Sequence, residues 1–288
     1  MMGFDPDSLR IVCEALMLVV LSLLAGAGVL GVKLDEPRLF RLAAVALGIY
    51  GIALVGDALA TTAVLTEAPL ADLPGLAGTV ITKSIVGHLI AVSAVGWFLL
   101  LAAFLTRRRW TDHRVFLRLS LSGFLLLAYG RAANGHASED GLFGTPVFIH
   151  LLHVLAGTLW AGSLMVYSQL PVGAIQGRES DLAKHLSEVA TTALMTIVFT
   201  GLGDAIRMAE GVTGFWHTAY AQALAIKLAV VTLAVGMGGW NRLNVLSRVE
   251  NGGGDAAVSF RRIVRLESLV LLAILILAAR LGALSPLE

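Results

Sequence analysis

The feature that most constrains the fold is a series of long apolar segments that takes up most of the 288-residue chain. A helix needs about 20 apolar residues to cross the hydrocarbon core of a bilayer. Because the bilayer offers no water to backbone groups, such segments cross it as helices. We therefore expect an all-α, multi-pass membrane bundle with about eight spans, at residues 9–32, 39–62, 80–105, 115–133, 146–171, 184–207, 218–243 and 261–284.

The composition agrees with a membrane protein. Hydrophobic residues make up 57% of the chain and charged residues 14%, with a mean hydropathy of +0.82, whereas soluble domains carry about 25% charged residues. The single cysteine, Cys13, excludes a disulfide framework, a four-cysteine zinc site and an iron–sulfur cluster held by this chain alone. The sequence has no lysine- or arginine-rich tail and no glycine-rich phosphate loop, so we expect no nucleic-acid partner. No predicted loop has room for a soluble domain, so we expect one bundle over residues 1–288.

The positive charges of the short loops predict the orientation of the chain. Loops 63–79, 134–145 and 208–217 contain no lysine or arginine. The alternate loops hold Lys33, Arg38, Arg41, Arg107, Arg108, Arg109, Arg114, Arg178, Lys184, Arg248, Arg261 and Arg262. Basic loops stay in the cytoplasm. We therefore expect both termini on the periplasmic side of a bacterial inner membrane.

Two histidines at the start of the fifth predicted span are the first candidates for a site. His150 and His153 are three residues apart, so both imidazoles lie on one face of a helix. Gly157 and Ala161 continue that face as a small-residue pair, which predicts the close approach of a neighbouring helix. Ionisable groups at membrane depth are costly and usually mark a site or a pathway.

Further polar or sulfur-containing side chains fall in the same, outer half of the predicted membrane. His88, about two turns into the third predicted span, is the candidate for a third imidazole ligand. The other members of this group are His136, His217, Glu14, Asp57, Cys13, Met17 and Met208.

The chemistry of this group favours copper. Imidazole binds copper, zinc, iron and nickel, and thiol or thioether sulfur favours Cu(I). Cys13 and Met17 are four residues apart and share one face of the first predicted span. Magnesium and calcium prefer oxygen ligands, so the mixture of His, Met and Cys indicates copper, as Cu(I) or Cu(II).

Two functions follow from these residues. A transporter would bind copper at His150, His153 and His88 and pass it inward between helices. Alternatively, His88 with His150 or His153 would hold haem b in an electron-transfer protein, since membrane cytochromes bind haem between two histidines of facing helices. Besides these two, the histidines could hold the catalytic metal of an enzyme acting at the outer surface, with Glu14 or Asp57 as general base. No Ser/His/Asp order or zinc-protease motif supports hydrolysis, which favours a transporter over an enzyme.

At the inner side, polar residues of the last two predicted spans are expected to meet. Asn241 and Arg242 end the seventh span and Glu267 lies early in the eighth. A charge pair there would hold the two helices together. Lys227 lies in the middle of the seventh span.

Several of these motifs, taken in order, resemble the copper resistance protein D (CopD) family. They are Gly135-His136-Ala137, then His150 to Trp160-Ala161-Gly162, Leu224-Ala225-Ile226-Lys227-Leu228, Asn241-Arg242, Phe260-Arg261-Arg262 and Arg265-Leu266-Glu267. The likeness covers residues 120 to 288 well, and the first 110 by the number of spans alone. It departs from the family at Ser163, where glycine is usual, and at His185 and Glu188.

The resemblance implies an inner-membrane protein of copper homeostasis that moves or handles copper, often beside a small periplasmic copper-binding partner. It marks His136, His150, Trp160, Lys227, Asn241 and Glu267 as positions of the family type. The expected ligand of the protein is thus the copper ion, in a protein embedded in the lipid bilayer.

Overall fold

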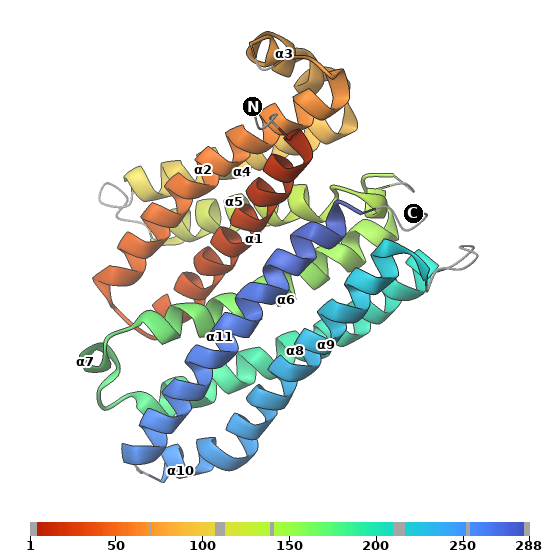
Figure 1. The fold of residues 1–288 in the computed structure, drawn as a ribbon. Helices are drawn as coiled ribbons and strands as arrows, with labels where there is room; N and C mark the ends of the chain where they lie inside the picture. The colour runs from red at the N-terminus through yellow and green to blue at the C-terminus, as the bar shows by residue number, and fades with distance from the viewer. Residues whose placement is uncertain are drawn as a thin grey trace. The chain divides into compact units, whose positions relative to one another are not determined.

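The structure is a computed structural model that describes residues 5–69, 71–106, 113–138, 141–209, 217–251 and 254–284, and the secondary structure of this part of the chain is entirely helical. Figure 1 shows the α-helices along the chain. They are α1 (Pro6–Gly31), α2 (Pro37–Thr66), α3 (Leu73–Lys83), α4 (Ile85–Thr106), α5 (His113–Ala132), α6 (Thr145–Gln169), α7 (Val172–Ile175), α8 (Glu179–Ala209), α9 (Ala219–Trp240), α10 (Leu246–Glu250) and α11 (Gly254–Gly282). A 3₁₀-helix, η1 (His136–Ser138), precedes α6, and a π-helix, η3 (Asn241–Val245), follows α9.

Seven of these helices are long and apolar enough to span a membrane: Pro6–Gly31, Pro37–Thr66, Ile85–Thr106, Arg114–Ala132, Thr145–Gln169, Glu179–Arg207 and Ala219–Val249. The eighth predicted span corresponds to α11, which is helical but is not among them, because its apolar part also carries Arg265, Glu267 and Arg280. The orientation stays a prediction, and Arg107, Arg108 and Arg109 of one basic loop lie outside the described residues.

The predicted third span, 80–105, is wrong at its start. The helix is interrupted at Ser84, whose backbone is extended (φ −108°, ψ 152°) between α3 and α4. The Ser84 hydroxyl accepts a hydrogen bond from the Gly87 backbone N–H at 2.9 Å. A serine that satisfies a free N–H of the first turn is a typical N-cap, so the membrane-spanning helix α4 begins at Ile85.

The chain forms two compact units, and each is built from two segments. Unit 1 contains residues 1–21 and 44–154, and unit 2 contains residues 22–43 and 155–288. Helices α1, α2 and α6 each contribute residues to both units. The single bundle expected from the sequence stays a prediction.

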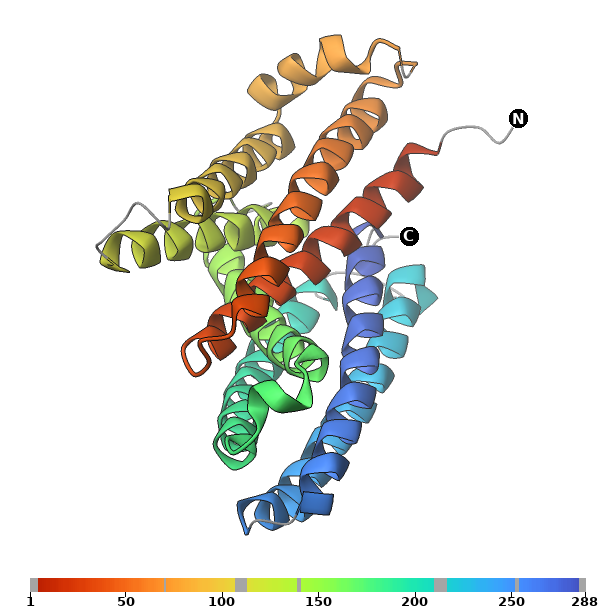
Figure 2. The same ribbon diagram turned by 90° about the vertical axis from the view of Figure 1, so that its left-hand side faces the viewer.

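In unit 1, α4 packs closely against α5 (Figure 2). Gly96 of α4 faces Gly123 of α5, and a Cβ atom added at either glycine would lie 2.7 Å from the carbonyl oxygen of the other. The Trp97 indole N–H donates to the Leu47 carbonyl of α2 at 2.8 Å, which fixes α4 against α2.

In unit 2, α9 and α11 run side by side (Figures 1 and 2). Gly162 of α6 contacts the backbone of Ser22 and Gly26 in α1 so closely that a Cβ atom at Gly162 would overlap with the Ser22 carbonyl. Gly157, which the sequence places in the small-residue contact, has open space beside it. That prediction is wrong by just over one turn, because the close approach lies at Gly162.

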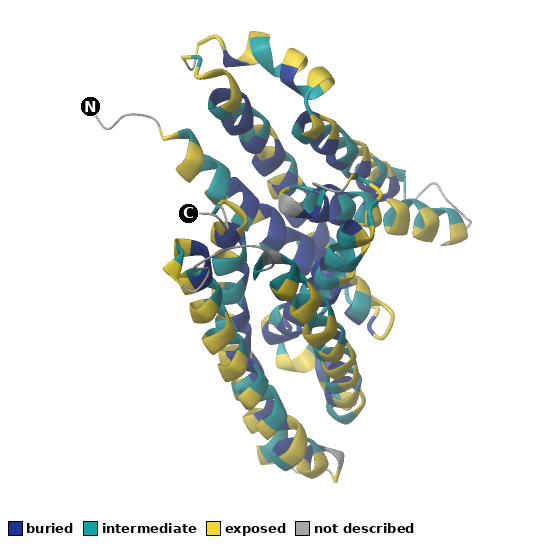
Figure 3. Ribbon diagram, turned by 90° about the vertical axis from the view of Figure 1, so that its right-hand side faces the viewer, coloured by how far each residue is buried: buried dark blue, intermediate teal, exposed yellow. Residues whose placement is uncertain are grey.

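The outer faces of α8 and α9 are mostly exposed, as Figure 3 shows. The exposed side chains are large and apolar, for example Phe199 and Leu202 on α8 and Leu228 and Leu233 on α9. In a membrane-spanning helix such a surface is in contact with lipid, because apolar side chains are not driven inward there as they are in water.

Candidate functional site

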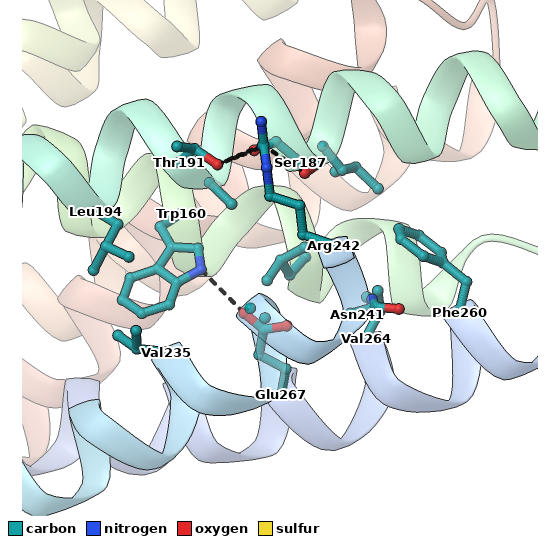
Figure 4. Close-up of a pocket in the computed structure, with 15 residues that line it drawn as sticks. Trp160, Ser187, Thr191, Leu194, Val235, Asn241, Arg242, Phe260, Val264 and Glu267 are labelled. Carbon is teal, nitrogen blue, oxygen red and sulfur yellow. Dashed lines mark hydrogen bonds between the residues drawn. The ribbon is translucent and has the colours of Figure 1, made fainter. Parts of the chain in front are cut away.

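A cavity of about 210 Å³ lies within unit 2, between α6, α8, α11 and the junction of α9 with η3. Figure 4 shows its lining. Most of the surface is apolar, with side chains such as Leu164, Leu194 and Phe260. The polar lining residues are Trp160, Ser187, Thr191, Asn241, Arg242 and Glu267. Three residues singled out in the sequence, Trp160, Asn241 and Glu267, thus meet at one place.

Glu267 is the buried acid of this cavity. It is 2% exposed, and its Oε1 accepts a hydrogen bond from the Trp160 indole N–H at 3.2 Å (Figure 4). Gly238 of α9 leaves space for the carboxylate, because a Cβ atom there would lie 3.0 Å from Oε1. Three helices thus build this part of the cavity: α11 supplies Glu267, α6 supplies the hydrogen-bond donor Trp160, and α9 leaves room at Gly238.

Arg242 lines the same cavity but binds to α8. Its Nη1 donates to the Ser187 carbonyl at 3.1 Å, the Ser187 hydroxyl at 2.8 Å and the Thr191 hydroxyl at 2.7 Å. None of the ion pairs in the described part of the chain joins Arg242 to Glu267. The expected charge pair between the last two helices is therefore wrong, because α8 offers Arg242 three neutral acceptors instead.

Asn241 contributes a second oxygen at the point where α9 becomes the π-helix η3. Its side chain is 5% exposed, and Oδ1 has no hydrogen-bond partner among the described residues. π-Helical turns are rare and are often found at functional sites. A carboxylate and an amide oxygen therefore line one membrane-embedded cavity, where a cation or a hydrogen-bond donor would satisfy both.

The predicted histidine ligands lie in several places. His150 and His153 stack on one face of α6, as their spacing predicts, with ring centroids 6.0 Å apart and planes 8° apart. His88 lies in the first turn of α4 rather than two turns into a span, is exposed, and has Nε2 3.2 Å from the Thr82 carbonyl oxygen. His217 is exposed just before α9. The His136 and Met208 side chains lie outside the described residues.

The remaining candidates are distributed between the units. Cys13, Glu14, Met17 and Asp57 are all buried in unit 1. Lys227 is half-buried in the middle of α9. Within the part of the chain that the structure describes, no three His, Cys, Asp or Glu side chains come together as a metal site. A metal centre at the histidines therefore stays a prediction.

Sequence reasoning did not find the polar partners supplied by α8. Ser187 and Thr191 are four residues apart, so both face the cavity from one side of the helix. Ser and Thr are common on membrane helices and often hydrogen-bond within their own helix, as Thr191 does with the Ser187 carbonyl. The four-residue spacing of Ser187 and Thr191 was thus the only sequence feature that indicated a shared polar face. It is weak evidence, because such residues are common on membrane helices.

Part of the chain that includes cavity residues matches a known protein family. Residues 180–281, which include α9, η3 and most of α8 and α11, match the family described as Copper resistance protein D (CopD). Over these residues, about a third of its length, the chain is similar to the CopD family. The cavity residues Asn241, Arg242 and Glu267 all lie inside the matched range, whereas Trp160 precedes it. With seven helices in its described part that are able to span a membrane, the chain is a multi-pass membrane protein.

A curated protein with a similar sequence also has copper in its name. The chain is 27% identical over 176 residues to the Copper transport protein CutJ of Bacillus subtilis (strain 168), a match that covers 59% of this chain. It spans about 30% of the length of that relative. No solved structure matches the chain.

Proposed function

We propose that this protein moves copper across the membrane that its helices span, and that it takes up the ion at His150 and His153 of α6. The observation that carries the proposal is the match of residues 180–281 to the CopD family, in a chain whose described part has seven helices able to span a membrane. The name of the similar protein, a copper transport protein, supports the same cargo. The family resemblance further suggests a small periplasmic copper-binding protein as the donor.

The histidine pair supports uptake because both rings lie on one face and one turn apart. Metal–nitrogen bonds are about 2 Å long, so one ion can bind both rings after their side chains rotate toward each other. We propose His88 and His136 as further ligands. Weaker candidates for ligands or their supporting groups are Cys13, Met17, Glu14, Asp57, His217 and Met208.

The cavity around Glu267 is, in this proposal, a position that the ion passes inside the membrane. Among the described residues, the Glu267 carboxylate accepts a hydrogen bond from the side chain of Trp160, and the Asn241 side-chain oxygen accepts none. Nitrogen and oxygen ligands suit Cu(II). A negative side chain also lowers the high electrostatic cost of a cation in hydrocarbon surroundings.

Transport is tested in liposomes that contain the purified protein and a copper-sensitive dye. We expect His150→Ala with His153→Ala to lose copper binding and uptake together, because both proposed first ligands are absent. Glu267→Gln keeps the shape and the Oε1 acceptor but removes the charge, so binding persists while uptake slows. His185→Ala, a half-buried histidine of α8, is the matched control and keeps both. Unchanged copper binding in the double variant would contradict the uptake site.

An absorbance spectrum of the same preparation separates copper transport from haem binding. A Soret band that shifts on reduction would show haem ligation and would overturn the proposal. Stoichiometric copper without that band agrees with it.

A further inference from the structure

A buried arginine of α11 carries a charge that no ion pair in the described part of the chain neutralises. Arg261 is 9% exposed, and its Nε and Nη1 are buried without a hydrogen-bond partner among the described residues. A guanidinium group keeps its proton at any physiological pH. Because a buried charge without a partner is strongly unfavourable, Arg261 is suited to an acceptor that comes from outside these residues.

The groups near Arg261 add a second positive charge and a hydroxyl. Arg265, one turn further along α11 and exposed, and Tyr167 of α6 act on Arg261 electrostatically. Glu179 of α8 acts on Tyr167 but forms no ion pair with Arg261. Glu267 faces the cavity of the candidate site, which Arg261 does not line. Two arginines and a hydroxyl therefore lie at one place in unit 2, and none of the described acids forms an ion pair there.

This place lies close to one surface of the membrane. Arg261 is the eighth residue of α11, so it lies about 10 Å along the helix axis from the first residue. Tyr167, two residues before the end of α6, packs edge-to-face on Phe260. The end of α9 and the start of α11 are joined through α10 (Figure 1). Trp240, the last residue of α9, is 63% exposed. Because tryptophan is enriched at the membrane–water interface, Arg261 lies near the level of the lipid headgroups.

Exposed apolar side chains flank the buried arginine on α11. Val258 is 71% exposed and Leu269 is 65% exposed. Val258 lies three residues before Arg261 and Arg265 four residues after it, so both are its neighbours on the helix surface. Leu269, four residues after Arg265, continues this row toward the middle of the helix. A row that combines an exposed arginine with apolar side chains suits an amphiphile with a charged head and an apolar tail better than it suits a free anion.

We propose that Arg261 binds the phosphate group of an anionic phospholipid at this end of unit 2. The guanidinium donates two parallel hydrogen bonds to phosphate oxygens, for which its planar shape is suited. Arg265 adds a second positive charge, the Tyr167 hydroxyl adds a further donor, and an acyl chain of the lipid lies along Leu269. Because no described acid pairs with either arginine, a lipid of net negative charge binds more tightly than a zwitterionic one. This inference uses none of the proposed copper ligands.

Lipid binding is measured by native mass spectrometry on the purified full-length protein in detergent, without copper. Phosphatidylglycerol and phosphatidylcholine are added separately at equal concentrations. We expect the unaltered protein to retain one phosphatidylglycerol molecule, and Arg261→Gln to weaken its apparent affinity about tenfold or more, because charged hydrogen bonds are lost. Arg262→Gln is the matched control, since it removes the same charge from the next, exposed residue of α11 and should keep the affinity. An equal loss in both variants would show a general attraction to a positive surface and would overturn the site.

Two further arms test the source of the phosphate and the role of its net charge. Inorganic phosphate at millimolar concentration should not displace the lipid, because it has no acyl chain. Displacement would assign the site to a soluble phosphate and overturn the lipid as the ligand. Phosphatidylcholine retained as tightly as phosphatidylglycerol would overturn the preference for an anionic lipid.

A second variant keeps the proposal testable if Arg261→Gln does not fold. Tyr167→Phe preserves every charge and removes only the proposed hydroxyl donor. We expect it to weaken phosphatidylglycerol about fivefold. In that case, an affinity equal to that of the unaltered protein would overturn the site. None of these outcomes affects the proposed copper transport, which the liposome assay tests separately.

Discussion

Two glycines of the same helix should respond in opposite ways to replacement by alanine. Gly162 of α6 lies against the backbone of Ser22 and Gly26, and an added Cβ would be 2.5 Å from the Ser22 carbonyl carbon and 3.0 Å from the Gly26 nitrogen. Ordinary contacts of this kind are about 3.5–4.0 Å. The backbones of α1 and α6 must therefore separate by about 1 Å, because neither partner is a movable side chain. Gly157 has no atom within 4 Å of an added Cβ.

The expected magnitudes follow from two opposing effects. Overpacking a close contact costs about 1–3 kcal/mol, and replacing a helical glycine by alanine contributes about 1 kcal/mol in favour of the helix. Because the overlap is with backbone atoms, the cost lies near the upper end of that range, and Gly162→Ala should lower the free energy of unfolding by about 2 kcal/mol. Gly157→Ala should leave it unchanged or raise it by up to about 1 kcal/mol. Unfolding of both variants by SDS in mixed micelles, followed by circular dichroism, measures the difference. Equal stability of the two variants would refute the close contact at Gly162.

Three other substitutions test individual contacts, each by unfolding in the same micelles. Trp160→Phe removes the donor to the buried Glu267 and should cost about 2 kcal/mol; in a Glu267→Leu background the cost should shrink, and an undiminished cost would rule out the hydrogen bond as its cause. Arg131→Met leaves Glu14 with only the more exposed Arg10 and should cost about 3–5 kcal/mol, unless Glu14→Gln is present as well. Trp97→Phe frees a carbonyl of α2 and should cost about 1 kcal/mol, and a neutral result would contradict that contact.

The positions of most helices were predictable because membrane helices are long and apolar. The predicted spans 39–62 and 218–243 correspond to α2 and α9, with ends that differ by a few residues. The break at Ser84 was not predicted, because the apolar residues continue across it and the N-cap depends on one hydroxyl. α11 is helical as expected, but it is less apolar than the seven candidate spans because it carries Arg265, Glu267 and Arg280.

The candidate site was predictable in part. Asn241 and Glu267 were expected to meet at the inner side, and Trp160 was marked by the family resemblance alone. The structure brings all three to one cavity. The partner of Arg242 was not predictable, because Ser187 and Thr191 lie more than 50 residues away on a different helix. The predicted depth of His88 in the membrane was wrong because it was counted from residue 80 as the start of the helix. The interruption at Ser84 moves the start of the spanning helix to Ile85.

The way the chain divides has a consequence for its biogenesis. Unit 2 includes residues 22–43 and residues 155–288, and the ribosome makes the second segment more than a hundred residues after the first. The second half of α1 therefore enters the bilayer more than a hundred residues before Gly162, the glycine that it contacts. Until then its packing surface needs lipid or an insertion factor as a temporary neighbour. Interrupted synthesis after α5 would leave that half-helix without its lasting partners, as a substrate for membrane quality control.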